Sequence, residues 1–129
     1  MLKQITPNLM TEDVDRTIAF YIDHLGFTLK DKYPEQGAAV WAELKRDDVT
    51  LMFQSRQSMA EEIPALQDVP IGTSQTFYTV VEDIDALHAE LQGKVEIVQA
   101  MHTTFYGAKE FSFKDCNGYI FAYAEATSA

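Results

Sequence analysis

The chain contains two similar segments, TEDVDRTIAF at residues 11–20 and VEDIDALHAE at residues 81–90, which are related by an offset of 70. In each segment an acidic pair is followed by an apolar residue and a further Asp. The second acid, Asp13 or Asp83, stands where a helix N-cap is expected, and the next Asp lies in the first turn, where the helix dipole favours carboxylates. The repeat predicts two equivalent helices and restricts the fold to architectures built from two copies of one unit.

Both predicted helices have an apolar face, because apolar residues recur with helical spacing after each capping Asp. These apolar positions are Val14, Ile18, Tyr21, Ile22 and Leu25 in the first copy, and Ile84, Leu87 and Leu91 in the second. Gly26 and Gly93 follow the apolar runs, as expected of residues at a helix C-terminus. Both segments are therefore predicted to be amphipathic helices.

Short segments rich in β-branched and aromatic residues flank each helix and indicate strands. One strand candidate precedes each helix, at residues 3–10 and 75–81. Three more follow each helix: FTLKDKY, AAVWAEL and VTLMFQ in the first copy, and VEIVQAM, KEFSF and YIFAYAE in the second. The predicted unit is β-α-β-β-β, written twice.

A single α+β domain is the fold class that this pattern predicts, since neither unit alone can bury both its sheet face and its helix. The expected divisions are a domain at 1–129, a first unit at 1–54, a connector at 55–74 with a short helix around Met59 to Leu66, and a second unit at 75–126. We expect the two units to form a curved eight-stranded mixed sheet with helices on the convex face. Its concave face, lined by both units, is the predicted ligand pocket.

Composition and charge narrow the class of protein. With 47% hydrophobic and 12% aromatic residues, the chain can bury the core of one domain. The sequence has no apolar window of the ~18–20 residues that a membrane span needs and no signal-like start, so we predict a cytoplasmic location and no membrane partner. The net charge of −10 disfavours nucleic acid as a partner and favours cationic small molecules.

Two long segments resemble a known family. PNLMTEDVDRTIAFYIDHLGF is similar to the opening of the vicinal oxygen chelate superfamily, which includes glyoxalase I, extradiol dioxygenases and bleomycin-resistance proteins, and FYGAKEFSFKDCNGYIFAYAE is similar to its closing segment. The middle segments, RDDVTLMFQ and VVEDIDALHAEL, most closely resemble the bleomycin-resistance branch. The resemblance implies the glyoxalase/bleomycin-resistance fold and a homodimer whose two clefts are built by both chains. It says less about chemistry, because this fold supports many activities.

Enzymes of the superfamily hold one metal ion through four side chains, usually His, Gln or Glu, contributed by both units. The four matching places in this chain are Thr6, Met52, Thr76 and Ala122. They do not provide the nitrogen and oxygen donors that a divalent metal requires. The resemblance therefore implies that the chain has no metal site and no cofactor, and no catalytic residue is assigned.

The histidines and the single cysteine give weaker signals. His24 is expected to complement the C-terminal end of the first helix, and His88 to lie at a partly exposed boundary. His102 either faces the mouth of the pocket or is an ordinary loop residue. Cys116 excludes an internal disulfide, and we interpret it as a turn residue in KDCNGY.

Alternation along the strands predicts which residues share the pocket face with the four matched places. Across the hairpins we expect Trp41 and Glu43 opposite Met52 and Thr50, and Phe111 and Phe113 opposite Ala122 and Ile120. The loop HTTFYG should add side chains at the rim. The candidate ligand-binding residues are Asn8, Trp41, Glu43, Met52, Gln54, Thr76, Tyr78, His102, Tyr106 and Phe111.

A wall of aromatic rings beside carboxylates suits a flat, partly cationic ligand. We therefore predict a metal-free binding protein that sequesters a small molecule, with a basic antibiotic as a candidate ligand. The segment YGAKEF departs from the Trp-Gly-Arg-Glu-Phe form common in resistance proteins, which leaves drug specificity open. The alternative is a lyase, isomerase or oxygenase of the same superfamily with an atypical site, or a metal-independent enzyme using Glu43 or His102 as general base.

Overall fold

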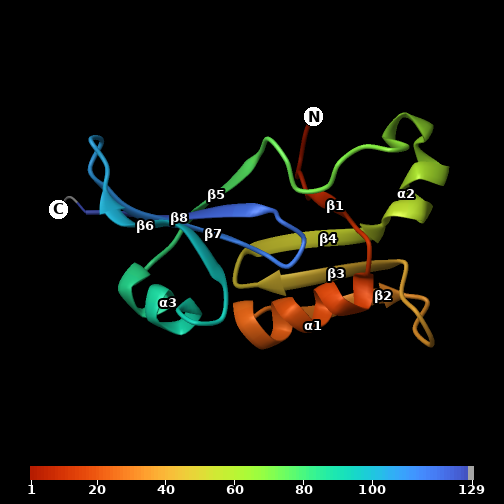
Figure 1. Ribbon diagram of the computed structural model, residues 1–129, viewed down its shortest axis with the longest axis horizontal. Helices are drawn as coiled ribbons and strands as arrows, with labels where there is room; N and C mark the ends of the chain where they lie inside the picture. Colours follow the sequence, from red (N-terminus) through yellow and green to blue (C-terminus); the bar gives the residue numbers. More distant parts are fainter. Residues whose placement is uncertain (128–129) are drawn as a thin grey trace. The chain divides into compact units, whose positions relative to one another are not determined.

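The computed structural model describes residues 1–127, so the last two residues of the predicted domain, 128–129, lie outside the described part of the chain. The chain divides into two compact units, Met1–Ile71 and Gly72–Ala129 (Figure 1). Unit 1 contains β1 (Asn8–Thr11), α1 (Val14–Leu25), β2 (Thr28–Tyr33), β3 (Trp41–Arg46), β4 (Val49–Ser55), α2 (Arg56–Glu62) and the 3-10 helix η1 (Pro64–Leu66). Unit 2 contains β5 (Thr76–Val80), α3 (Ile84–Leu91), β6 (Glu96–Thr103), β7 (Ala108–Lys114) and β8 (Ile120–Ala126).

Both units have the same topology. The strand order is β1-β4-β3-β2 in unit 1 and β5-β8-β7-β6 in unit 2. In each unit the first strand pairs in parallel with the last, and the remaining pairs are antiparallel. The predicted α+β class and the repeated β-α-β-β-β unit are confirmed. Within residues 1–127 the hydrogen-bonded strands form two four-stranded sheets, one in each unit.

Helix α1 begins and ends where the sequence predicts. The side chain of Asp13 accepts a hydrogen bond from the Arg16 backbone N–H at 3.0 Å, and Gly26 follows the helix with a left-handed φ of 73°. A Cβ at Gly26 would lie 2.7 Å from Arg46 Nη1. Arg46 Nη1 also donates a hydrogen bond to the carbonyl of Leu25, the last residue of α1, at 2.7 Å. This bond gives a partner to a carbonyl group at the C-terminus of the helix. The left-handed φ is what favours glycine here, since a Cβ would meet only the flexible end of the Arg46 side chain.

The core of unit 1 lies between α1 and one face of its sheet. Tyr21 of α1 is fully buried, and its ring centroid lies 5.3 Å from that of Phe27 and 4.9 Å from that of Phe53 on β4. Helix α1 contacts β2, β3 and β4, and Figure 1 shows it lying along them. The sheet therefore has one face covered by a helix, and its alternate residues point to the other face.

Helix α3 begins differently from α1. Asp83 occupies the N-cap position, but its φ is 55° and its side chain makes no capping hydrogen bond. The carboxylate of Glu125 accepts from the backbone N–H of Ile84 at 3.0 Å and of Asp83 at 2.9 Å. These two hydrogen bonds lower the pKa of Glu125. Asp83 therefore stands at the predicted N-cap position, but the hydrogen bonds that a capping side chain would accept are accepted by a carboxylate from β8.

Aromatic residues fill the core of unit 2. Helix α3 packs on β7 and β8, and the His88 ring lies 4.9 Å from that of Phe111. Phe113 and Phe121 stack with centroids 5.5 Å apart, and Tyr123 meets Phe113 edge-on at 5.0 Å. These contacts define the helix-covered face of the second sheet.

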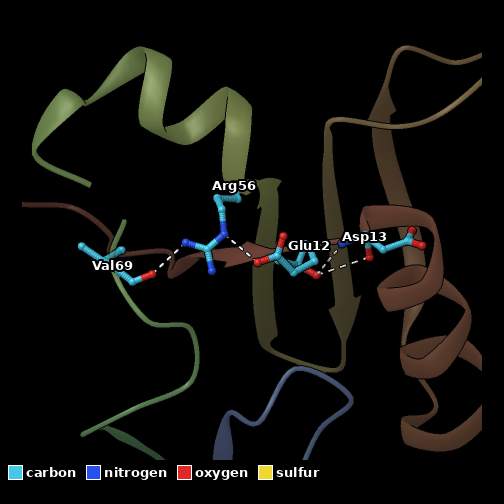
Figure 2. A network of polar contacts seen from close by, with 5 residues as sticks. Glu12, Asp13, Arg56 and Val69 are labelled. Carbon is cyan, nitrogen blue, oxygen red and sulfur yellow. Dashed lines mark hydrogen bonds and ion pairs between the residues drawn. The ribbon is translucent and has the colours of Figure 1, made fainter. Parts of the chain in front are cut away.

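The connector packs with unit 1. The short helix expected around Met59 to Leu66 appears as α2 followed by η1. Arg56, at the start of α2, donates from Nε to Glu12 Oε1 at 2.6 Å and from Nη1 to the Val69 carbonyl at 2.8 Å (Figure 2). The Arg56 side chain therefore links Glu12, the residue after β1, to Val69 in the connector. Across residues 1–127, no helix has the length and apolar character that a membrane span requires.

Candidate ligand-binding faces

The first candidate face is the side of the unit 1 sheet opposite α1. Ala42 and Leu44 of β3 are fully buried and alternate with Trp41 and Glu43, which are partly exposed. On β4, Phe53 contacts α1 through Tyr21, so its neighbour Met52 points to the opposite side. We call this side the polar face of sheet 1. This face includes Asn8, Asp31, Tyr33, Trp41, Glu43, Met52 and Gln54.

The register of the β3–β4 hairpin differs from the predicted one by two residues. Trp41 pairs with Gln54 and Glu43 pairs with Met52, instead of with Met52 and Thr50. The strands join through a tight turn after Arg46, in which Asp47 has a φ of 50°. A shift of two residues leaves every side chain on its predicted face, so the predicted neighbours still lie together.

Two polar candidates on this face bind each other. Asn8 Nδ2 donates to Gln54 Oε1 at 2.8 Å, and Gln54 Nε2 donates to Ser58 Oγ of α2 at 2.9 Å. Gln54 is buried, so its amide needs these partners. The chain of hydrogen bonds fixes β1 and α2 to β4. Asn8 and Gln54 therefore shape the face, in addition to lying on it.

Acidic and aromatic residues form adjacent cross-strand pairs on the polar face of sheet 1. Tyr33 of β2 lies opposite Trp41, and Asp31 lies opposite Glu43. Aromatic cross-strand pairs stabilise a sheet, whereas like charges directly opposite one another destabilise it. No hydrogen bond or ion pair involves the Glu43 side chain within residues 1–127. This arrangement places two carboxylates and two rings in adjacent cross-strand positions. Lys45 shares this face two residues from Glu43 on β3, but no ion pair within the described residues joins it to Glu43.

The second candidate face belongs to unit 2 and centres on Glu110 of β7. Glu110 pairs with Ala124 of β8, on the side of the sheet opposite α3. Its side chain is only 7% exposed. Tyr78 of β5 donates its hydroxyl to Glu110 Oε2 at 3.0 Å, and the Tyr106 hydroxyl donates to the same oxygen through a short hydrogen bond. We call these three residues the Tyr–Glu–Tyr cluster.

Hydrogen bonding to Glu110 holds the proton on Tyr106. This bond, with smaller effects of burial and of Tyr78, raises the Tyr106 pKa from 10.0 to about 12. A donor to a carboxylate loses that bond when it ionises, so the neutral phenol is favoured. Tyr106 therefore acts as a hydrogen-bond donor near neutral pH and is unsuited to act as a base.

Two further predicted residues lie on the same sheet. His102 of β6 is opposite Glu110 in the ladder, and its Nδ1 lies 2.9 Å from the Ala100 carbonyl. Thr76 pairs with Ile120 two residues before Tyr78 and is exposed. The structure therefore joins Tyr78 and Tyr106 to Glu110, which sequence analysis did not select, and places His102 opposite Glu110 on the neighbouring strand.

Phe111 lies on the other side of the sheet. It pairs with Tyr123 instead of the predicted Ala122, it is fully buried, and it contacts His88 of α3. A register error of one residue moves a side chain to the opposite face. The loop between β7 and β8 sets this register, because Asp115 Oδ1 accepts from the backbone of Asn117 and Tyr119 at 2.8 Å each. The prediction that Phe111 faces the pocket side of the sheet is wrong, and the correct register would have selected Glu110.

The places matched to the metal ligands of family enzymes do not fit a divalent metal. Thr6 precedes β1 and accepts from Gln4 Nε2 at 3.1 Å, and Met52 and Ala122 offer no oxygen or nitrogen donor from their side chains. Across residues 1–127, no group of three or more His, Cys, Asp or Glu residues could hold a metal ion. Absence of metal from the purified protein stays a prediction.

The remaining singled-out residues are structural in character. His24 lies in the last turn of α1, with its ring centroid 5.0 Å from that of Phe20. Its Nδ1 is buried and makes no hydrogen bond within the described residues. Cys116 is partly exposed and lies in the β7–β8 loop.

A comparison of the sequence with known protein families agrees with the observed fold. The family model of the Glyoxalase/Bleomycin resistance protein/Dioxygenase superfamily matches residues 2–123. The chain therefore belongs to this superfamily, as its opening and closing segments predicted. No curated protein sequence matches the chain.

The solved structures that are similar to this chain include both a binding protein and an enzyme. A bleomycin-binding protein complexed with bleomycin is 20% identical, with a TM-score of 0.70 over 96% of this chain and 98% of that chain. A glyoxalase-related enzyme from Clostridium phytofermentans is 19% identical, with a TM-score of 0.73 over 98% and 96%. A glyoxalase/bleomycin resistance protein/dioxygenase from Nocardioides is 21% identical, with a TM-score of 0.78 over 100% and 88%. At these identities the similarity shows the fold alone.

Proposed function

We propose that this protein is a metal-free binding protein that sequesters a cationic aromatic small molecule without transforming it. The ligand class includes basic antibiotics. The resemblance implies a homodimer with clefts built by both chains, and we propose that it acts in the cytoplasm. The observation that carries the proposal is the pair of acids beside the pair of rings on the polar face of sheet 1. A cationic aromatic ligand would compensate the charges of Asp31 and Glu43 and stack on Trp41 and Tyr33.

The charge balance supports this ligand class. The net charge of −10 attracts cations over distances of about 8–10 Å at physiological salt. The side chain of Glu43 has no partner within residues 1–127, so a ligand would not have to displace one. The superfamily also includes a bleomycin-binding protein, which gives a binding role a precedent on this fold.

An enzyme of the same superfamily is the second candidate, because one structural relative is a glyoxalase-related enzyme. A metal-dependent reaction is disfavoured by Thr6, Met52, Thr76 and Ala122, whose side chains lack a metal donor set. A metal-independent reaction would need Glu43 or His102 as general base. Turnover of glyoxalase and extradiol substrates by the purified protein would favour this candidate.

Trp41 provides the test of the binding proposal, since it is the only Trp in the chain. A cationic aromatic ligand should change its fluorescence, and a neutral isostere should bind more weakly. We expect Glu43→Gln to weaken cation binding by about 1–3 kcal/mol, the cost of losing a charge-assisted contact. Glu62→Gln, which removes the same charge from an exposed site on α2, is the control. Equal affinities of Glu43→Gln and wild type would remove Glu43 from the site.

A further inference from the structure

The carboxylate of Glu110 is a buried charge without a cationic partner. It is 7% exposed, and none of the ion pairs in the described part of the chain involves it. The nearby Lys109 instead pairs with Asp85 at 2.6 Å on the other side of the strand. Buried carboxylates are normally compensated by a cation or by several hydrogen bonds. Within the described residues Glu110 is therefore compensated by hydrogen bonds from two tyrosines and by no cation.

The hydrogen bonds around Glu110 are one-sided. Both Tyr78 and Tyr106 donate to Oε2, and within residues 1–127 no donor bonds to Oε1. A carboxylate can accept about four hydrogen bonds, two at each oxygen. The cluster therefore keeps acceptor capacity that a ligand N–H could use.

The two tyrosines combine this acceptor with aromatic surface. Each is 55% exposed although its hydroxyl is bonded to a buried carboxylate. Their hydroxyls are fixed as donors to Glu110, so their orientation is set before any ligand arrives. Carboxylate and tyrosine rings together are the groups that bind ammonium and guanidinium ions.

We propose that the Tyr–Glu–Tyr cluster is a cation-binding subsite that receives a primary ammonium or guanidinium group of the ligand. The inference rests on the proposed binding function and specifies a separate subsite in unit 2 for the same class of ligand. This subsite lies wholly within unit 2, whereas Trp41 and Glu43 belong to unit 1. His102, opposite Glu110, is the other titratable side chain of the subsite. An ammonium group would donate to Glu110 while the rings of Tyr78 and Tyr106 flank it.

Benzylammonium is the probe, and benzyl alcohol is its neutral analogue. Calorimetric titration should show that the wild-type protein binds the cation at least 10-fold more tightly than the alcohol. Glu110→Gln keeps the shape but removes the charge and replaces one acceptor oxygen with an NH2 donor, so it should weaken benzylammonium binding at least 10-fold. Glu96→Gln removes the same charge from an exposed position on the neighbouring strand β6 and should stay within 2-fold of wild type.

A second measurement keeps the test independent of how well Glu110→Gln folds. Ring proton resonances of Tyr78 and Tyr106 in the wild-type protein should shift on adding benzylammonium, with the same midpoint as the calorimetry. Unshifted rings, or equal affinities of Glu110→Gln and wild type, would overturn the subsite. If Glu43→Gln alone lost affinity, this inference would fail and the proposed function would stand. If the tyrosine rings shifted while Trp41 fluorescence did not change, the subsite would stand and the role of the sheet 1 face would fail.

Discussion

Replacement of Phe111 by Leu tests whether this ring belongs to the core or to a ligand-binding face. The side chain is fully buried, with ring centroids 4.9 Å from His88, 6.1 Å from Phe113 and 5.7 Å from Tyr123. Leu keeps much of the apolar volume, so the loss comes mainly from these ring contacts and a small cavity. Aromatic pairs contribute about 0.5–1.5 kcal/mol each, and three incompletely additive contacts give an expected loss of about 1.5–3 kcal/mol.

Phe105→Leu is the matched control for this replacement. Phe105 lies in the β6–β7 loop, is 100% exposed and undergoes the same chemical change, so its effect should stay within about 0.5 kcal/mol. Urea unfolding followed by circular dichroism measures both differences, and the melting temperature of Phe111→Leu should fall by about 5–15 °C. If the two variants were equally stable, Phe111 would not be in the core, and the register of β7 against β8 would be wrong.

Three other predictions follow from single contacts. Because hydrogen bonding to Glu110 raises the Tyr106 pKa to about 12, the stability from this bond is fully present below pH ~10 and is lost as pH rises through 12. Phenolate absorbance should show a late-titrating component that is lost in Tyr106→Phe and titrates earlier in Glu110→Gln. Since the backbone hydrogen bonds from Ile84 and Asp83 hold the pKa of Glu125 below its usual value of 4.5, the stabilising effect of Glu125 exists above pH ~4.5 and is lost on further acidification. The stability difference between wild type and Glu125→Gln should therefore shrink in acid, and an unchanged difference would contradict the cap. Light scattering should give twice the mass of one chain at micromolar concentrations, and a monomer would contradict the proposed dimer.

Local sequence signals predicted most of the fold. The Asp13 cap, the Gly26 terminus and the alternation along β3 and β4 each depend on neighbouring residues, and all three were correctly located. The polar face of sheet 1 was predictable for the same reason. Its hairpin register was wrong by two residues, an error that preserves the face.

Features that depend on distant partners were not predictable. The cap of α3 comes from Glu125, which is 42 residues from Asp83 in the chain, so no local pattern could reveal it. In the β7–β8 hairpin, the five-residue loop at residues 115–119 displaced the register by one. That single displacement exchanged the two faces of the strand, which placed Phe111 in the predicted pocket wall and left Glu110 out.

Metal content distinguishes most directly between a binding protein and a metal-dependent enzyme of this superfamily. A true site at about 100 times its dissociation constant would stabilise the fold by roughly 2.7 kcal/mol, which for a chain of this length raises the melting temperature by about 10 °C. We expect nickel, zinc, manganese and ferrous iron, added in excess to chelator-treated protein, to raise it by no more than about 2 °C. Elemental analysis of the protein as isolated should find metal well below one ion per chain. A near-stoichiometric metal, or a rise of about 10 °C with any of the four ions, would contradict the account and favour the enzyme.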